Sequence, residues 1–360
     1  MDVTQLLRDV QGGHRLTEEE AVDLFKVHDR QVWEITAAAD VLRERKNGDA
    51  VTFVRNQNLN VTNICINACG FCGFSRRESD PDSFLHDETA VRRKVAQARD
   101  RNVTEICTVS GLHPAFTGES YVDILAVIRS EAPGIHIHAS NPMEVAYGAR
   151  KSGWTTREML ERMKAAGLGS MCGTAAEILV DSVRERICPG KIDTATWEEI
   201  IREAHALGIH TTATIMYGSG ESIEERVEHL AIIRRIQEDT GMFTEFVPLS
   251  FVHMNTPLFL RNAANAGATG REDILLYAVA RMFLDNVDHI QSSWVKLGRK
   301  MAQLCLLAGA DDLGGTMYEE SISKGAGATD TDYLDPGEMH RIAADLGRPL
   351  RQRTTLYTLI

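Results

Sequence analysis

Apolar and polar positions divide this 360-residue chain into a helical beginning and a long stretch in which strands and helices alternate. Thr17 is followed by three glutamates, and Leu24 and Phe25 continue an apolar stripe at helical spacing, which predicts a capped amphipathic helix. A second helix is expected over residues 29–46. We expect residues 1–50 to form a helical extension that packs on a larger domain.

Short runs rich in β-branched residues alternate with amphipathic segments from residue 51 onward, as in parallel βα units. The predicted strands are residues 58–63, 105–110, 135–140, 170–173, 210–217, 244–249, 289–293 and 312–315. The predicted helices are residues 88–101, 121–131, 156–166, 196–207, 223–240, 273–284 and 296–308. This order predicts an α/β fold with a (βα)8 TIM-type barrel over residues 51–315. A six-stranded partial barrel with a C-terminal cap is the alternative count.

The last part of the chain, residues 316–360, is expected to contain a loop, a helix and a terminal strand. Residues 316–335 are rich in glycine, serine and threonine, which predicts a mobile segment over the mouth of the barrel. Residues 354–360 (TTLYTLI) are predicted to form a strand that covers an edge or an end of the barrel.

The formal charge of −12 argues against a nucleic-acid or anionic-membrane partner, because either would need a basic face. No run of 18 apolar residues occurs, and the first residues lack the basic-then-apolar order of a signal peptide. The sequence therefore predicts a cytoplasmic protein. Its seven unevenly spaced cysteines do not describe a disulfide framework.

Three of the cysteines, Cys65, Cys69 and Cys72, form a C-x3-C-x2-C motif. Three thiolates on one short loop suit a corner of an iron–sulfur cluster and leave one iron free to bind a small molecule. The other four cysteines stand alone, so none completes a local zinc pattern. Three buried structural thiols are the simpler reading, but buried cysteines need no such spacing.

This motif is that of the radical S-adenosylmethionine (SAM) enzymes. Together with four further segments, it resembles the family of the 4-hydroxyphenyl transferase subunit of deazaflavin (FO) synthase, and the similarity runs from residue 55 to residue 328. The segments are residues 58–75 (NLNVTNICINACGFCGFS), 111–114 (GLHP), 173–179 (GTAAEIL), 245–254 (EFVPLSFVHM) and 293–298 (SWVKLG). The deazaflavin-forming partner subunit and the futalosine-pathway enzymes of menaquinone synthesis share the same general plan.

The resemblance implies a radical SAM barrel in which the three cysteines hold a 4Fe-4S cluster and the open iron binds SAM. The implied reaction cleaves L-tyrosine and joins its 4-hydroxybenzyl group to 5-amino-6-(D-ribitylamino)uracil. It releases 2-iminoacetate and serves the synthesis of deazaflavin, the precursor of coenzyme F-420. The chain has one cysteine motif, so the deazaflavin-forming radical SAM subunit is expected to be a separate protein. An electron donor such as ferredoxin or flavodoxin is also implied.

Six residues are expected to bind the cofactor. By resemblance, Phe71 lies along the adenine and Ser110-Gly111 bind the methionine amino group, while a core role for Phe71 is the alternative. Glu177 follows a strand and is expected to accept hydrogen bonds from the SAM ribose, or else to be a first-turn helix glutamate. Ser140 shares a strand face with two histidines, and Met216 belongs to a loose copy of the radical SAM adenine motif.

Six further residues near predicted strand ends are candidates to bind substrate: His113, His138, Tyr217, Glu245, His253 and Lys296. Each has a structural role as its alternative, and a metal site formed by His136 and His138 lacks a third ligand. The family often has histidine after the Tyr-Gly pair, where this chain has Ser219 and Gly220. This departure leaves the exact substrate open. A futalosine-pathway enzyme is one alternative, against which residues 245–254 and 293–298 favour the transferase, and a non-catalytic iron–sulfur electron-transfer protein is the other.

Overall fold

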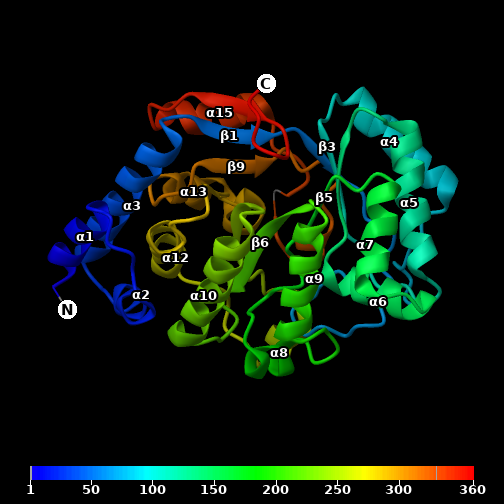
Figure 1. Ribbon diagram of the computed structural model, residues 1–360, viewed down its shortest axis with the longest axis horizontal. Helices are drawn as coiled ribbons and strands as arrows, with labels where there is room; N and C mark the ends of the chain where they lie inside the picture. Colours follow the sequence, from blue (N-terminus) through cyan, green and yellow to red (C-terminus); the bar gives the residue numbers. More distant parts are fainter. Residues whose placement is uncertain (1, 330) are drawn as a thin grey trace.

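The computed structural model describes residues 2–329 and 331–360, which form a curled parallel sheet with helices on its outer face (Figure 1). Seven strands follow one another around the sheet in sequence order, β2-β3-β4-β5-β6-β7-β8. Their bounds are β2 (Asn56–Asn58), β3 (Glu105–Thr108), β4 (His136–Ala139), β5 (Ser170–Met171), β6 (His210–Tyr217), β7 (Phe243–Ser250) and β8 (His289–Ile290). All paired strands are parallel, so their carboxyl ends meet at one face.

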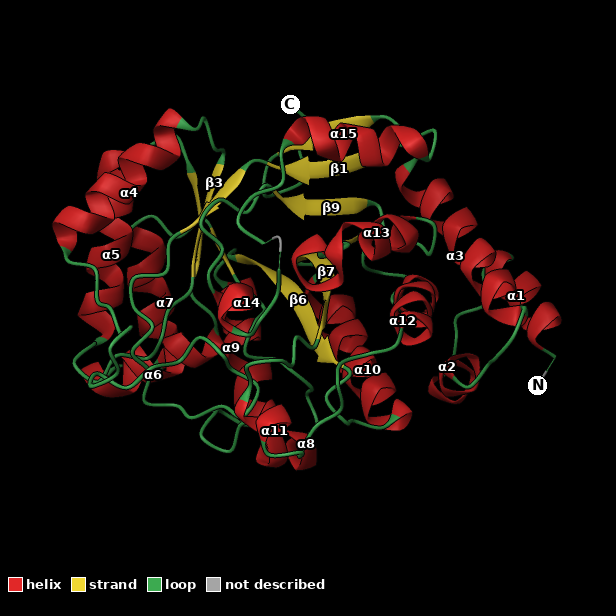
Figure 2. Cartoon of the chain, turned by 180° about the vertical axis from the view of Figure 1, so that it is seen from behind, coloured by secondary structure: helices red, strands yellow, loops and turns green. Residues whose placement is uncertain are grey.

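The two edges of this sheet are joined by β9 (Asp312–Gly315) and the residues directly after it, since Asp312 bridges to Gln291 and Tyr318 bridges to Gln57. On one side the Ser292 N–H donates to the Asp312 carbonyl at 2.7 Å, and on the other the Asn58 N–H donates to the Tyr318 carbonyl at 2.8 Å. The ring of βα units is thus completed at its eighth position. Strand β9 also belongs to a second, three-stranded sheet with β1 (Val51–Val54) and β10 (Leu350–Arg353), in the order β10-β1-β9. In Figure 2 this small sheet lies beneath α15 (Pro336–Asp345).

Helices of the βα units cover the outside of the sheet. They are α4 (Glu88–Asp100), α5 (Gly118–Glu131), α6 (Pro142–Ser152), α7 (Thr156–Ala165), α8 (Asp181–Ile187), α9 (Thr194–Ala206), α10 (Ile223–Thr240), α12 (Gly270–Phe283) and α13 (Trp294–Leu306). Two short helices, α11 (Pro257–Leu260) and α14 (Ile322–Gly325), lie in the loops at the working face. Within the described residues, no helix is both long and apolar enough to cross a membrane.

The amino-terminal extension consists of α1 (Val3–Gln11), α2 (Glu18–Phe25) and α3 (Gln31–Asn47). Helix α2 packs against α10 and α12, α3 packs against α12, and α1 packs on α3. The capping box predicted at Thr17 is present, because its side chain accepts from the Glu20 N–H while the Glu20 carboxylate accepts from the Thr17 N–H. The apolar stripe of α2 is buried at Leu24 and Phe25. The barrel that the sequence predicted is confirmed, while the division into three domains stays a prediction.

Two local predictions are wrong. The first strands are β1 and β2, of which only Asn58 falls within the predicted residues 58–63, and residues 59–63 form the loop that leads to the cysteines. The terminal strand is β10, whereas residues 354–360 make a turn. The described part of residues 316–335 includes α14 and lies at the working face as predicted, because Ile322 and Ala326 line the cavity there and the Asn255 N–H donates to the Ala326 carbonyl at 3.0 Å. The mobility of this segment stays a prediction.

Candidate active site

A cavity of about 240 Å³ opens at the carboxyl ends of the strands, where the cysteine loop folds over the barrel. Nine of the residues predicted from the sequence line it: Cys65, Cys69, Phe71, Cys72, Ser110, Gly111, Glu177, Met216 and Lys296. Apolar side chains make most of the remaining wall, among them Phe74, Leu112, Leu249, Phe251, Val252 and Ile322. The cavity is therefore lined largely by apolar side chains with some polar groups among them, as binding sites for small molecules commonly are.

The cysteine loop is held in place by backbone hydrogen bonds on two sides. The Gly70 N–H donates to the Ile187 carbonyl at 2.9 Å, and the Gly70 carbonyl accepts from the Leu258 N–H at 2.8 Å. Gly73 lies so close to α14 that a Cβ built on it would be 2.5 Å from the Ala326 Cα. Only glycine fits there without moving the loop, so the sequence C-G-F-C-G packs the three thiols against the barrel mouth.

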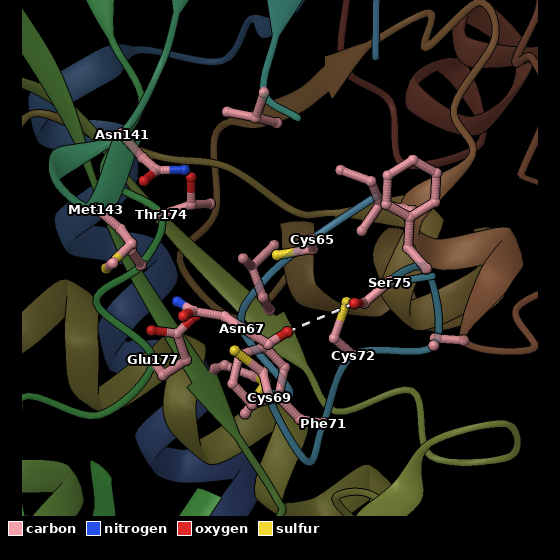
Figure 3. A pocket seen from close by; sticks show the side chains of 18 of the residues that line it. Cys65, Asn67, Cys69, Phe71, Cys72, Ser75, Asn141, Met143, Thr174 and Glu177 are labelled. Carbon is pink, nitrogen blue, oxygen red and sulfur yellow. Dashed lines mark hydrogen bonds between the residues drawn. The ribbon is translucent and has the colours of Figure 1, made fainter. Parts of the chain in front are cut away.

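The three thiols face the cavity from one side in Figure 3, where Cys65 and Cys72 lie apart and Cys69 lies below them. Burial raises the pKa of Cys69 to about 12 and raises that of Cys65. Neutral buried thiols of this kind become ligands only when a cation replaces their protons. The donor set therefore suits an iron–sulfur cluster.

Among residues 2–329 and 331–360, no three His, Cys, Asp or Glu side chains converge on one point as the ligands of a single metal ion would. Ligands of a cubane cluster are spaced more widely, because each thiolate binds a different iron. The histidine pair of β4, His136 and His138, lacks a third ligand here as well, as the sequence predicted.

Glu177 and Lys191 form a buried ion pair on the cavity wall near Cys69. The Lys191 Nζ lies 2.7 Å from Glu177 Oε1, and burial would lower the pKa of this lysine, but the Glu177 charge raises it above its usual value. Glu177 Oε2 is buried and has no hydrogen-bond partner within the described chain, with Arg184 3.8 Å away. One carboxylate oxygen is thus fixed by the lysine, and the other is left for a ligand.

Three more polar atoms of the cavity wall are buried without a hydrogen-bond partner in the described residues: Asn67 Nδ2, Glu144 Oε2 and Thr174 Oγ1. Buried polar atoms are rarely left unpaired, because each loses its hydrogen bonds to water. In Figure 3, Asn67, Thr174 and Glu177 are drawn around the same hollow as the cysteines. A polar molecule such as SAM, with hydroxyl, amino and carboxylate groups, would satisfy such donors and acceptors.

Ser110 and Gly111 shape the wall beside the cluster loop. A Cβ on Gly111 would lie 2.4 Å from the Ile64 carbonyl oxygen, so glycine is required for the close approach of the two segments. The Ser110 N–H donates to Glu144 Oε1 at 3.2 Å, and the Ser110 hydroxyl accepts from the Val61 N–H at 2.8 Å. The carboxyl group of Glu144, in the first turn of α6, therefore links this helix to the segment that follows β3.

The buried carboxyl group of Glu144 should make the stability of the folded protein depend on pH. Burial raises its pKa from the ordinary 4.5 to about 8, so the folded protein keeps a proton that the unfolded chain releases. Stability should then fall as pH rises from 4.5 to 8, by about 2–4 kcal/mol over this window. We expect Glu144→Gln to flatten this part of a plot of melting temperature against pH, whereas Glu185→Gln, at an exposed position, should not. An unchanged slope in Glu144→Gln would contradict this assignment.

Three predicted residues lie outside the main cavity near the strand ends. Ser140 borders a smaller space of about 10 Å³ next to it, together with Glu144. His113 accepts from the Ala115 N–H at 3.1 Å and packs on Phe116, so it braces its loop. His138 shares the Ser170 hydroxyl with His136, at 2.7 and 2.8 Å, and burial lowers its pKa, which makes it a neutral hydrogen-bonding histidine.

The structure also places Tyr217, Glu245 and His253 away from the cavity. Alternation along β6 directs Met216 to the cavity and Tyr217 to the opposite face, where its hydroxyl donates to Asp273 at 2.6 Å. Glu245 lies near the start of β7, at the closed end of the barrel, and accepts from the Tyr357 hydroxyl at 2.7 Å. His253 lies past the strand and packs edge-on against Phe259.

Several lining residues were missed by the sequence reasoning: Asn67, Asn141, Met143, Glu144, Thr174 and Lys191. Asn141 and Glu144 carry a recognisable signal, because Asn-Pro-x-Glu is an N-cap pattern directly after a strand, and the Asn141 side chain does accept from the Glu144 N–H. Lys191 follows a short helix by a turn and carries no comparable signal.

The loose adenine motif ends at Glu221, whose carboxylate accepts from the backbone N–H groups of Gly218, Ser219 and Gly220 at 2.7 to 3.2 Å. Arg226 pairs with the same carboxylate at 2.6 Å. Glu221 therefore organises the loop after β6. Of the motif residues, Thr214 and Met216 line the cavity.

Comparison with known families accounts for most of the chain. Residues 59–233 match the radical SAM superfamily, and residues 240–356 match the CofH/MqnC C-terminal region. Two solved structures share the fold at low identity. Methylornithine synthase has a TM-score of 0.76 at 16% identity, covering 96% of this chain and 97% of that one. The FeFe-hydrogenase maturase HydG from Carboxydothermus hydrogenoformans has a TM-score of 0.78 at 17% identity, covering 99% and 80%.

Curated relatives match over nearly the full length. The 5-amino-6-(D-ribitylamino)uracil–L-tyrosine 4-hydroxyphenyl transferase of Methanoculleus marisnigri is 67% identical over 356 residues, which is 99% of this chain and 97% of that one. The proteins of the same name from Methanosphaerula palustris and Methanospirillum hungatei are 66% and 57% identical, each over 99% of this chain and 98% of the relative. The chain therefore belongs to the radical SAM superfamily and, within it, to the family of these 4-hydroxyphenyl transferases.

Proposed function

We propose that this protein cleaves L-tyrosine and transfers its 4-hydroxybenzyl group to 5-amino-6-(D-ribitylamino)uracil, releasing 2-iminoacetate. The observation that carries the proposal is the full-length identity of 57–67% to transferases of that name. The cavity supports it, because thiols, unpaired polar atoms and an apolar wall meet at the working face of the barrel. The product is a precursor of deazaflavin.

The chain's own residues hold the cofactors and shape the chamber. Cys65, Cys69 and Cys72 would hold the 4Fe-4S cluster, and the free oxygen of Glu177 would accept hydrogen bonds from the ribose of SAM. Lys191 orients the Glu177 carboxylate. Its Nζ lies 5.0 Å from the centre of the Phe71 ring, so this ring lies beside the proposed site for SAM. These contacts would fix the cofactor between the cysteine loop and β6.

When bound, the cluster and SAM supply a 5'-deoxyadenosyl radical after one-electron reduction. The protein must then keep water and stray hydrogen donors away from the reacting atoms. Leu249, Phe251, Val252 and Ile322 serve this purpose in the wall, and α14 closes over the mouth through the contact of Gly73 with Ala326. The acid–base groups of the cavity mainly position the reactants.

We further propose a separate deazaflavin-forming radical SAM protein as the enzyme that takes up the product, since this chain has only one C-x3-C-x2-C motif. A small electron carrier of the ferredoxin or flavodoxin type would supply the electron. A cytoplasmic location fits both partners.

The test is anaerobic reconstitution with iron and sulfide, followed by mass spectrometry after incubation with SAM, dithionite, L-tyrosine and the ribitylated diaminouracil. We expect 5'-deoxyadenosine, 2-iminoacetate or its hydrolysis product glyoxylate, and the coupled uracil product. An aminodeoxyfutalosine-type substrate serves as the matched control, because a futalosine-pathway enzyme is the alternative function. Turnover of the control substrate, and none of tyrosine, would refute the proposal.

A further inference from the structure

Lys296 differs from the other charged groups of the cavity in having no partner. Lys191 and Lys296 are the two cationic side chains among the described residues that line it. Lys191 is neutralised by Glu177 at 2.7 Å. The Lys296 side chain makes no hydrogen bond or ion pair of 4.0 Å or less with any described residue.

The position of Lys296 is fixed by the fold around it. It lies in the first turn of α13, before the kink at Gly298, and the neighbouring Trp294 is buried with its indole N–H donating to the Gly315 carbonyl at 2.9 Å. The carboxylate of Glu320 acts electrostatically on Lys296, but it accepts from the Ser323 N–H at 2.9 Å and forms no ion pair with the lysine. Lys296 is half-buried and lines the cavity, so its unpaired ammonium is accessible from the cavity, which indicates that an anion completes this site.

The charges of the three ligands identify that anion. This step rests on the proposed function. The carboxylate of SAM would be bound by the open iron, as the family resemblance implies, and 5-amino-6-(D-ribitylamino)uracil carries no carboxylate or phosphate. Among the organic ligands, the carboxylate of L-tyrosine is therefore the one anionic group that still needs a cation, and among the described residues Lys296 is the cation of the cavity without a paired anion.

We propose that Lys296 binds the α-carboxylate of L-tyrosine and, after cleavage, that of the 2-iminoacetate fragment. The opposite end of the amino acid then extends toward the apolar wall at Leu249, Phe251 and Val252. Lys296 is a binding residue in this arrangement, because the carboxylate is not itself altered in the reaction.

The experiment compares Lys296→Met with Lys300→Met, a matched change at an exposed position of the same helix. Loss of a charged hydrogen bond should raise the KM for tyrosine by about 10–100-fold in Lys296→Met. The KM for the diaminouracil, the cluster signal in electron paramagnetic resonance and SAM cleavage without tyrosine should stay at wild-type values. Lys296→Arg should restore much of the tyrosine affinity, and Lys300→Met should behave as wild type.

Tyramine, which is tyrosine without its carboxylate, makes the test specific. The wild-type protein should bind tyrosine more tightly than tyramine, and Lys296→Met should lose this preference. An unchanged KM for tyrosine, an equal loss of tyrosine and tyramine, a loss confined to the diaminouracil, or a lost cluster signal would each overturn the assignment. If Lys296→Met fails to fold, Lys296→Gln and Lys296→Arg carry the comparison. Failure of the proposed function can be distinguished from failure of the Lys296 assignment, because in that case the wild-type protein would turn over no tyrosine at all.

Discussion

Cys69→Ala is expected to reduce 5'-deoxyadenosine formation to the level of a protein-free control. Cys69 is the most buried thiol of the motif and lines the cavity, and the cluster it would help to hold supplies the radical. Removing one of three protein ligands leaves two corners of the cluster uncapped, so we expect loss of the 4Fe-4S absorption and of bound iron. The barrel should remain folded, because the cysteine loop lies above the strands. Iron content, visible absorption and far-ultraviolet circular dichroism check these three outcomes.

Cys188→Ala is the matched control. Cys188 is buried near Cys69, and burial raises its pKa to about 12, so it is the strongest rival for a fourth ligand. We expect this variant to keep its cluster and its SAM cleavage, since an open iron requires that no fourth cysteine binds. Retained activity in Cys69→Ala, or loss of the cluster in Cys188→Ala, would contradict a three-cysteine site.

The cysteine loop was predictable from sequence because its information is local. Three ligands within eight residues, Cys65 to Cys72, specify the cluster without any knowledge of the fold. The Thr17 capping box is also specified by residues that are close in sequence. Gly111 could be singled out because it directly follows a predicted strand. Helices with clear apolar stripes were predicted to within a few residues, and α10 was predicted with both of its ends correct.

Substrate candidates were less predictable, because the decisive information is which end and which face of a strand a side chain occupies. Glu245 is polar and close to a strand, but it lies near the amino end of β7, at the closed end of the barrel. Tyr217 lies at the correct end, but on the outer face, one residue after Met216. A register error of one residue is enough to exchange these roles.

Lys191 and the terminal strand were missed for a different reason. Both depend on contacts between segments far apart in the sequence, which a local pattern does not contain. The apolar residues of the last seven positions suggested a strand there, yet Leu359 and Ile360 are exposed. The polar segment Leu350–Arg353 pairs with β1 instead, because Arg353 finds buried carboxylates behind the sheet.

The closed end of the barrel is filled by a buried network of charges that the chain's last residues complete. Arg353 is 1% exposed, and its Nε donates to Asp312 Oδ2 at 2.5 Å while its Nη2 lies 3.4 Å from Glu245 Oε2. Its guanidinium also lies 3.9 Å from the centre of the Tyr357 ring, which in turn stacks on His289. Strand β10 is therefore fixed to β9 and β7 through one side chain.

Arg353→Met is expected to destabilise the protein by about 3–5 kcal/mol, because Asp312 and Glu245 would be left buried without their cation. Arg351→Met changes the same residue type two positions earlier, where the side chain is exposed, and should cost less than about 1 kcal/mol.

The double variant Arg353→Met with Asp312→Asn should be more stable than the sum of the two single changes predicts, since it removes both charges of the closest pair. Urea unfolding of the apoprotein compares the wild type, the three single variants Arg353→Met, Arg351→Met and Asp312→Asn, and the double variant. Equal midpoints for Arg353→Met and Arg351→Met would show that the network does not hold the terminal strand. Because the network lies at the end of the barrel away from the cluster, Arg353→Met that is still folded should bind iron as the wild type does.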